Sequence, residues 1–136
     1  MHLTEPLRAH GMRRARMLDV CPIDGVFDAH FRDSHVDGQG AETIVHEYTV
    51  VGAVDVVTRT VARVEPAARV LPWQECPGAL ASAARIEGMA VAALRDRIRT
   101  EFVGTSTCTH LNDTLRCLGD IAALIDAHER RVSSRP

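Results

Sequence analysis

Hydrophobic and polar positions alternate along the first half of the chain. In "GVFDAHFRDSHV", Phe27, Ala29 and Phe31 alternate with polar residues, which is the pattern of a strand with one apolar face. The stretches "TIVHEYTVV" and "VVTRTVARV" predict a second and a third strand, the third ending at Pro66 with even positions 56–64 facing inward. "RRARMLDVCPI" is a candidate edge strand before them. Turns in "VDGQGAE" and "VGAVD" are short, so neighbouring strands are expected to be antiparallel.

In the second half, apolar positions recur every three or four residues. Pro77 is expected to open a first helix, because proline is favoured at the first helical position, and Gly88 to end it. A second helix should end at Gly104, and a third should begin near Cys108 or Thr109. The last two helices carry apolar stripes, made of Val91, Leu94, Ile98 and Phe102, and of Leu111, Leu115, Leu118, Ala122 and Ile125.

These patterns predict an α+β fold. A three- to four-stranded antiparallel sheet over residues 13–71 is followed by about three helices over 77–128, packed on one face of the sheet. Residues 13–128 are expected to form a single domain, with loose polar termini at 1–12 and 129–136.

Composition narrows the classes of function. The net charge is -2, which gives no electrostatic reason to expect nucleic acid or an anionic membrane as a partner. All 16 basic residues are arginine, so lysine chemistry is excluded. No apolar run reaches the roughly 18 residues of a membrane span, and the polar stretch "MHLTEPLRAHGMRRARM" lacks the apolar region of a signal peptide. We therefore expect a cytoplasmic protein whose four cysteines are thiols, and none of them forms a CxxC pair.

Two cysteines lie at predicted helix starts. The free N–H groups and partial positive charge of a helix N-terminus favour thiolate, so Cys76 and Cys108 are candidate nucleophiles or soft metal ligands. The alternative is that each is a small buried residue between sheet and helices. Cys21 and Cys117 are interpreted as core residues.

Histidines and acids gather on the first hairpin. If its turn is centred at 38–39, His30 and His46 face each other on neighbouring strands and can share a metal ion. The alternative is that they are two partly exposed histidines on a solvent-facing surface of the sheet. Asp33 and Glu47 can orient a histidine, ligate a metal or move a proton, or they are solvated charges. The alternation that points Phe31 at the helices points His30 away from them, unless a bulge, a curled sheet or a subunit interface intervenes.

Several short strings resemble one known family. "FDAHFRD", "VHEY", "ECPGA" and "CTHL" follow the order and spacing found in an uncharacterised bacterial family, domain of unknown function 2889, over roughly residues 13–125. The sequence departs from the family pattern at Asp28, Glu47 and Thr107. The resemblance implies a site made from His30, Asp33, His46, Glu47, Cys76, Cys108 and His110.

A looser likeness is to NifU-type iron–sulfur scaffold proteins. They also run from a three-stranded sheet into helices with thiols at helix starts, although "VDGQGAE" has no counterpart of the scaffold's first cysteine. This likeness implies a metal or cluster carrier.

Four functions remain open from the sequence. The first is a metalloenzyme of lyase or hydrolase type acting on a small organic acid or thioester. Its Zn or Fe ion would be held by His30, His46, Cys76 and Cys108, with Asp33, Glu47 and His110 moving protons. The others are a metal or iron–sulfur carrier, a metal-free thiol enzyme using Cys108 with a histidine, and an interaction domain. The partner expected is a small-molecule substrate, and the sequence leaves a homodimer open.

Overall fold

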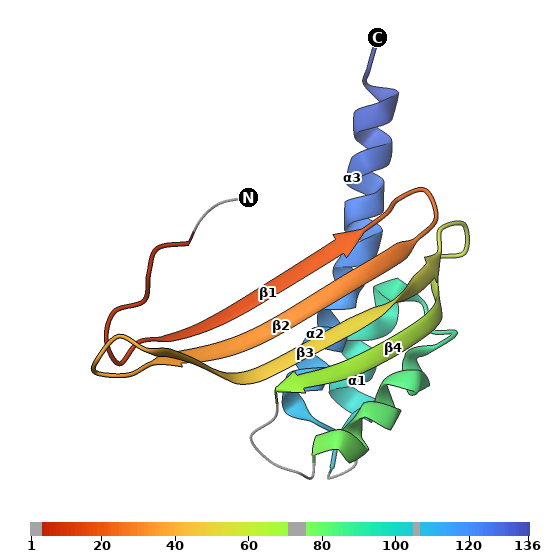
Figure 1. Cartoon of the computed structure of the whole chain (residues 1–136). Helices are drawn as coiled ribbons and strands as arrows, with labels where there is room; N and C mark the ends of the chain where they lie inside the picture. Colours follow the sequence, from red (N-terminus) through yellow and green to blue (C-terminus); the bar gives the residue numbers. More distant parts are fainter. Residues whose placement is uncertain (1–3, 71–75, 105–106) are drawn as a thin grey trace.

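The chain forms a four-stranded antiparallel meander followed by helices on one face of the sheet, so the expected α+β class is confirmed (Figure 1). A computed structural model describes residues 4–70, 76–104 and 107–136, without the side chains of residues 76–78. The strands are β1 (Met12–Val20), β2 (Val26–Val36), β3 (Glu42–Asp55) and β4 (Thr60–Val70), in the order β1-β2-β3-β4. The 3₁₀ helices are η1 (Cys76–Ile86), η2 (Val91–Ala93) and η3 (Leu118–Asp120), and the α-helices are α1 (Leu94–Glu101), α2 (Thr109–Cys117) and α3 (Ile121–Ser133).

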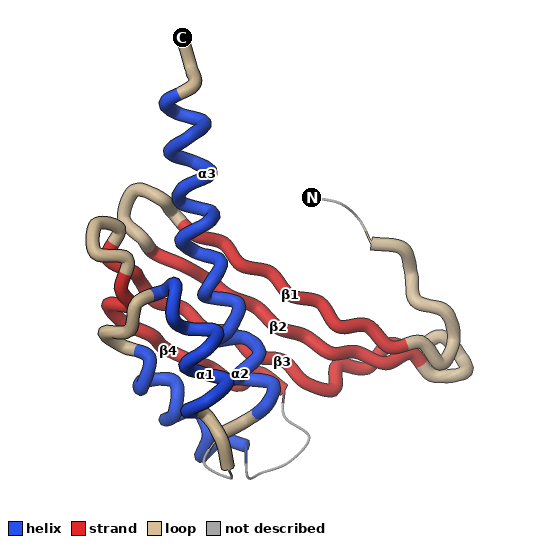
Figure 2. The backbone as a smooth tube through the Cα atoms, turned by 180° about the vertical axis from the view of Figure 1, so that it is seen from behind, coloured by secondary structure: helices blue, strands red, loops and turns tan. Residues whose placement is uncertain are grey.

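The core lies between the helices and one face of the sheet. Figure 2 shows from behind how the helices cover that face. Phe27, Ala29 and Phe31 all point into it, as their alternation predicts. Tyr48 and Val50 join them from β3. Burying one such large apolar side chain contributes about 1.5–3 kcal/mol, so this layer holds the two halves of the chain together. The far ends of β1, β2 and β3 extend beyond the helices (Figure 2).

The predicted helical stripes are confirmed, and so are two of the helix ends. All four apolar residues of the second predicted helix are buried, and so are Leu111, Leu115, Leu118 and Ile125 of the third, with Ala122 packed against the core. Gly88 and Gly104 have φ of 82° and 89°, a left-handed conformation that ends a helix at little cost for glycine. The first predicted helix is a 3₁₀ helix, and α3 continues to Ser133, five residues beyond the predicted boundary at 128.

The second predicted turn is wrong. "VGAVD" belongs to β3, and the chain turns afterwards at residues 56–59. The Asp55 carboxylate accepts hydrogen bonds from the backbone N–H groups of Val57 and Thr58, at 2.9 and 2.8 Å. These bonds fix the turn at residues 56–59, after the stretch where it was predicted. Pro66 lies within β4, which proline tolerates because β4 is an edge strand.

The predicted facing of the last strand is confirmed at Val64 and wrong at Ala62. Val61 and Val64 are buried whereas Ala62 is exposed, because the register of β3 against β4 shifts between Ala53 and Val54. A register shift of one residue exchanges the two faces of a strand.

One glycine allows β2, β3 and β4 to approach closely. A Cβ atom at Gly52 would lie 2.2 Å from the carbonyl oxygen of Arg63 and 2.7 Å from Cζ of Phe27. Neither a backbone oxygen nor a buried ring can move away easily. The position therefore accepts only glycine without local rearrangement.

Among the described residues, the longest apolar helical stretch is too short to cross a lipid bilayer.

Candidate functional site: an Asp–His–His cluster

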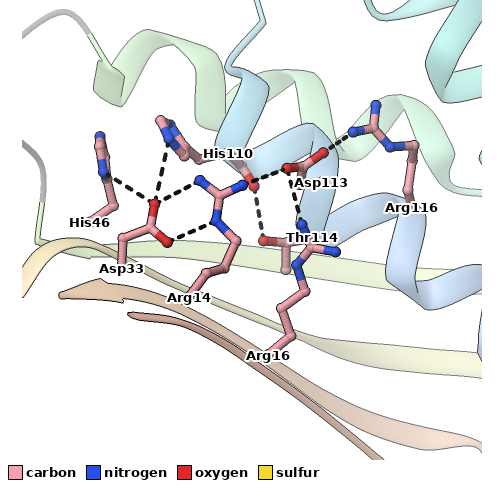
Figure 3. Close-up of polar contacts among 8 residues, drawn as sticks. All are labelled: Arg14, Arg16, Asp33, His46, His110, Asp113, Thr114 and Arg116. Carbon is pink, nitrogen blue, oxygen red and sulfur yellow. Dashed lines mark hydrogen bonds and ion pairs between the residues drawn. The ribbon is translucent and has the colours of Figure 1, made fainter. Parts of the chain in front are cut away.

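Three of the predicted site residues converge on the helix-facing side of the sheet. Asp33 comes from β2, His46 from β3 and His110 from the first turn of α2 (Figure 3). One possible ligand atom from each residue lies within 4.8 Å of the others. Asp33 is buried and both histidines are partly buried. We refer to these three residues as the Asp–His–His cluster.

A bulge in the first hairpin brings His46 to this face. Near the turn, Ser34 pairs with Ile44, but the next pair is Asp33 with His46, so Val45 is the extra residue of β3. Residues directly opposite in an antiparallel pair share a face of the sheet. Without the bulge, His46 would stand opposite Arg32, whose side chain lies with His30 on the other face. The bulge thus re-aims the histidine toward the helices.

The two imidazoles point at the same carboxylate oxygen. Nδ1 of His46 lies 3.7 Å and Nε2 of His110 lies 3.8 Å from Oδ2 of Asp33. The two rings stack with their centroids 3.8 Å apart. The Phe31 ring contacts the His110 ring at 5.7 Å between centroids and closes one side of the cluster.

Arg14 of β1 forms a bidentate ion pair with the carboxylate of Asp33. Its Nε donates to Oδ1 at 2.8 Å and its Nη2 donates to Oδ2 at 2.9 Å. Hydrogen bonding from Arg14 lowers the pKa of Asp33, with smaller contributions in the same direction from the charges of Arg14, His110 and His46. Asp33 is therefore ionised at neutral pH.

Burial sets the protonation state of His110. Its pKa is lowered, first by desolvation and then by the neighbouring His46, while Asp33 acts in the opposite direction. His110 is thus neutral at pH 7 and carries a ring nitrogen that can accept a proton or a metal ion. A neutral imidazole beside an ionised carboxylate is the combination that both metal binding and general base catalysis require.

An ion-pair network extends from the cluster along the seam between β1 and α2 (Figure 3). Asp113 of α2 faces Arg14 at 3.6 Å and Arg16 at 3.3 Å, and it also pairs with Arg116. The guanidinium groups of Arg14 and Arg16 lie 5.0 and 5.9 Å from the Phe31 ring centroid. Asp113 thereby joins the cluster to a group of arginines.

The predicted pairing of His30 with His46 is wrong. His30 pairs with Thr49, because the register differs from the predicted one by two to three residues. Its side chain lies on the opposite face of the sheet, where Nε2 is 2.7 Å from Oε1 of Glu47. Arg32 also donates to Glu47 at 2.9 Å, and this bond, followed by the one from His30, lowers the pKa of Glu47. His30, Arg32 and Glu47 therefore form a separate polar group on the opposite face, away from the cluster.

The predictions for the four cysteines compare differently with the structure. Cys108 immediately precedes α2 and its Sγ lies 3.2 Å from the hydroxyl of Tyr48, but it does not belong to the Asp–His–His cluster. Cys76 begins η1, and its side chain lies outside the described part of the structure, so its predicted proximity to Cys108 stays a prediction. Cys21 was interpreted as a core residue and is instead exposed, while Cys117 is only partly buried.

Sequence reasoning missed the arginine and acid partners of the cluster. Arg14 and Arg16 alternate along β1 with residues of the other face, and they precede Leu18 and Val20, which pack against the core. This alternation was the available signal, since it predicts that the two arginines share the helix-facing side. Asp113 gave a second signal, because it lies three residues after His110 and so on nearly the same face of α2.

Comparison with known proteins places the chain in a family but names no activity. The model of a family described as "Protein of unknown function (DUF2889)" matches residues 12–124, which is most of the chain. Neither the curated proteins nor the solved structures contain a significant match, so the looser likeness to NifU-type scaffolds gains no support. The match agrees with the resemblance seen in the short strings around His30, His46 and His110. The chain belongs to the family of proteins of unknown function DUF2889.

Proposed function

We propose that the Asp–His–His cluster binds one divalent metal ion, zinc or iron, and that the protein is a small metalloenzyme of lyase or hydrolase type. The single observation behind this proposal is the convergence of two imidazole nitrogens and one carboxylate oxygen within 4.8 Å of one another. Two histidines and one carboxylate form a common set of ligands for catalytic zinc and for non-haem iron. Three protein ligands leave further coordination positions for a substrate or water.

The separations of the ligand atoms support this reading. Metal–ligand bonds of about 2.0–2.2 Å place neighbouring ligand atoms about 3–3.5 Å apart. The two histidine nitrogens lie 3.7 and 3.8 Å from Oδ2 of Asp33, so small side-chain rotations bring them to that spacing. Oδ1 of Asp33 keeps its hydrogen bond from Arg14, as carboxylate ligands of metals are commonly held by a second partner.

The proposed reaction uses the metal as a Lewis acid. A bound divalent ion polarises a carbonyl oxygen or lowers the pKa of bound water, which suits cleavage of a small organic acid or thioester. Arg14 orients the carboxylate of Asp33, and the Phe31 ring packs beside the His110 ring. Glu47, predicted from the sequence to move protons, lies on the opposite face and has no part in this proposal.

A metal-free general base is the second candidate. The observation that favours it is that Arg14 already donates to both oxygens of Asp33, so a metal ion at Oδ2 would share that oxygen with Nη2 of Arg14. In this alternative the neutral His110 accepts a proton from the substrate, and Asp33 stabilises the imidazolium that forms. Metal content separates the two candidates.

The test is metal analysis of protein purified without a metal-affinity tag or a chelator. We expect about one equivalent of zinc or iron per chain, in keeping with a mononuclear site. Stripped protein should bind the same ion in calorimetric titration and become more stable, by about 2.7 kcal/mol when free metal is 100 times the dissociation constant. Asp33→Asn, His46→Ala and His110→Ala should each lose most of the bound metal and the added stability.

Two histidine variants serve as matched controls. His35→Ala removes a histidine of β2 that lies outside the cluster, and His30→Ala removes the one predicted from the sequence to be a ligand. Both should retain metal. A wild-type protein that carries no metal and shows no saturable binding would overturn the proposal in favour of the metal-free base. Loss of metal in His30→Ala with retention in His110→Ala would also refute it.

A further inference from the structure

Four arginines from three elements line a cavity of about 500 Å³ beside the cluster. Arg16 comes from β1, Arg95 and Arg99 lie one turn apart on α1, and Arg116 belongs to α2. Two acidic residues also line the cavity, Asp96 and Asp113. Four positive and two negative charges leave a net charge of +2 there, although the whole chain carries -2. The electrostatic potential in the cavity is therefore positive, although the protein as a whole is slightly acidic.

Most N–H donors of these four guanidinium groups have no hydrogen-bond partner among the described residues. Among the described residues, each is held through a single terminal nitrogen, Nη2. In this way Arg16 and Arg116 contact Asp113, Arg95 contacts Asp120 at 2.6 Å, and Arg99 contacts Asp96 at 3.4 Å. A guanidinium offers five N–H donors in a fixed fork. Nε and Nη1 of each have no partner among the described residues, and because these two N–H groups point in different directions, each can donate a separate hydrogen bond to an oxyanion.

A second, more apolar cavity adjoins the first. It has a volume of about 300 Å³ and shares Arg16, Arg95 and Cys117 with the arginine-lined cavity. Its other walls include Leu18, Ala29 and Phe31 from the helix-facing side of the sheet. Asp120 also lines it, so the two cavities together carry four positive and three negative charges, a net charge of +1. A ligand that spans the two would place a charged group among the arginines and an apolar body against Phe31. Together the cavities are within the range of small-molecule sites.

We propose that these joined cavities form a binding site for a small organic anion, a carboxylate or phosphate group attached to a short apolar body. Asp113 links the site to Arg14 and hence to Asp33, but no residue of the Asp–His–His cluster lines either cavity. The site therefore goes beyond the proposed metal centre and stands without it. Because Arg16, Arg95 and Arg99 are exposed, binding weakens as the salt concentration rises.

The experiment is a titration of metal-free protein, followed by two-dimensional NMR, with benzoate, acetate and inorganic phosphate at constant ionic strength. Benzoate should saturate, shift signals of β1, α1 and α2, and bind about tenfold more tightly than acetate because its ring enters the apolar cavity. Arg16→Gln and Arg116→Gln should each weaken benzoate binding about tenfold, the loss expected for one charged hydrogen-bonding partner. If phosphate binds more tightly than benzoate, the charged group is a phosphate and the apolar part of the proposal is wrong.

Arg97→Gln is the matched control. Arg97 lies on α1 between Arg95 and Arg99 and pairs with Glu101, but it does not line either cavity. It should leave benzoate binding within about twofold of wild type, and melting curves should show that all variants fold. His110→Ala should also bind benzoate normally, which separates this site from the metal proposal. Equal loss in Arg97→Gln, or unchanged binding in both Arg16→Gln and Arg116→Gln, would overturn the proposal.

Discussion

Arg14 is the residue whose removal should reveal how strongly the cluster is held. Asp33 is 7% exposed, and both of its oxygens accept hydrogen bonds from Arg14. Arg14→Gln keeps much of the side-chain volume but removes the positive charge and the two N–H groups that donate to Asp33. The Asp33 carboxylate would then stay buried with only two partly buried histidines near it.

The magnitude follows from the exposure of the two partners. Breaking a fully buried ion pair costs about 3–5 kcal/mol, whereas exposed pairs contribute about 0–1 kcal/mol. The Arg14 side chain is 46% exposed and that of Asp33 is 10% exposed, so water replaces part of what the guanidinium supplied. We therefore expect the interaction of Arg14 with Asp33 to contribute about 1–2 kcal/mol to the stability of metal-free protein at pH 7.

A double-mutant cycle with Asp33→Asn measures this contribution. Urea unfolding of the wild type, the two single variants and the double variant isolates the pairwise energy from the contact of Arg14 with Asp113. The pKa of Asp33 is lowered in the folded protein, so its stabilising contribution is present above the unfolded value of about 3.9 and is lost as pH falls through the lower folded value. The coupling energy should therefore vanish in acid.

Arg13→Gln is the control for this cycle. Arg13 is the neighbour of Arg14 in β1 and bonds to Thr4 and to the backbone of Glu5. Its coupling with Asp33→Asn should be near zero. A coupling between Arg14 and Asp33 below about 0.3 kcal/mol at pH 7, or one that persists unchanged in acid, would refute the reasoning.

Three further predictions concern packing, titration and thiol exposure. Gly52→Ala should destabilise the protein by about 3 kcal/mol in urea unfolding, because its Cβ has no room, whereas Gly40→Ala, with a φ of 88° and open space, should cost only about 1 kcal/mol. The pKa of His110 is lower in the folded protein than in the unfolded chain, so as the pH falls the unfolded chain binds a proton at His110 before the folded protein does. Stability of metal-free protein should therefore fall as pH drops below about 6.5, and His110→Gln should flatten that dependence. Of the three thiols whose side chains are described, Cys21 should be alkylated before Cys108 and Cys117 in mass-spectrometric mapping, because only Cys21 is exposed.

Local patterns were sufficient for the class of fold. The alternation of Phe27, Ala29 and Phe31 and the stripe from Leu111 to Ile125 both encode which side of an element is buried, and burial of that side is the main driving force of folding. Glycine at positions 88 and 104 ended helices as expected, because a left-handed residue is a local requirement. The sequence also supplied Asp33, His46 and His110 as candidate site residues.

The contacts among those residues depend on the tertiary structure. One extra residue in β3, Val45, decides that His46 stands opposite Asp33, and the sequence around it gives no sign of the bulge. The same kind of shift between Ala53 and Val54 reversed the facing predicted for Ala62, whereas Val64 keeps the predicted face. Register depends on the sum of all cross-strand contacts and turn geometries, so a difference of one residue cannot be read from a single strand.

What the sequence by itself determined about this protein is therefore the set of elements, their buried faces and the residue types able to do chemistry. Only the tertiary structure decided that Glu47 joins His30 on one face of the sheet while His46 joins Asp33 on the other. It also placed Arg14 of β1 directly opposite Asp33 of the neighbouring strand β2, and it gathered arginines from β1, α1 and α2 around one cavity. The physical reason is that periodicity is a property of neighbouring residues, whereas a site is made by residues far apart in the chain whose alignment is fixed by packing.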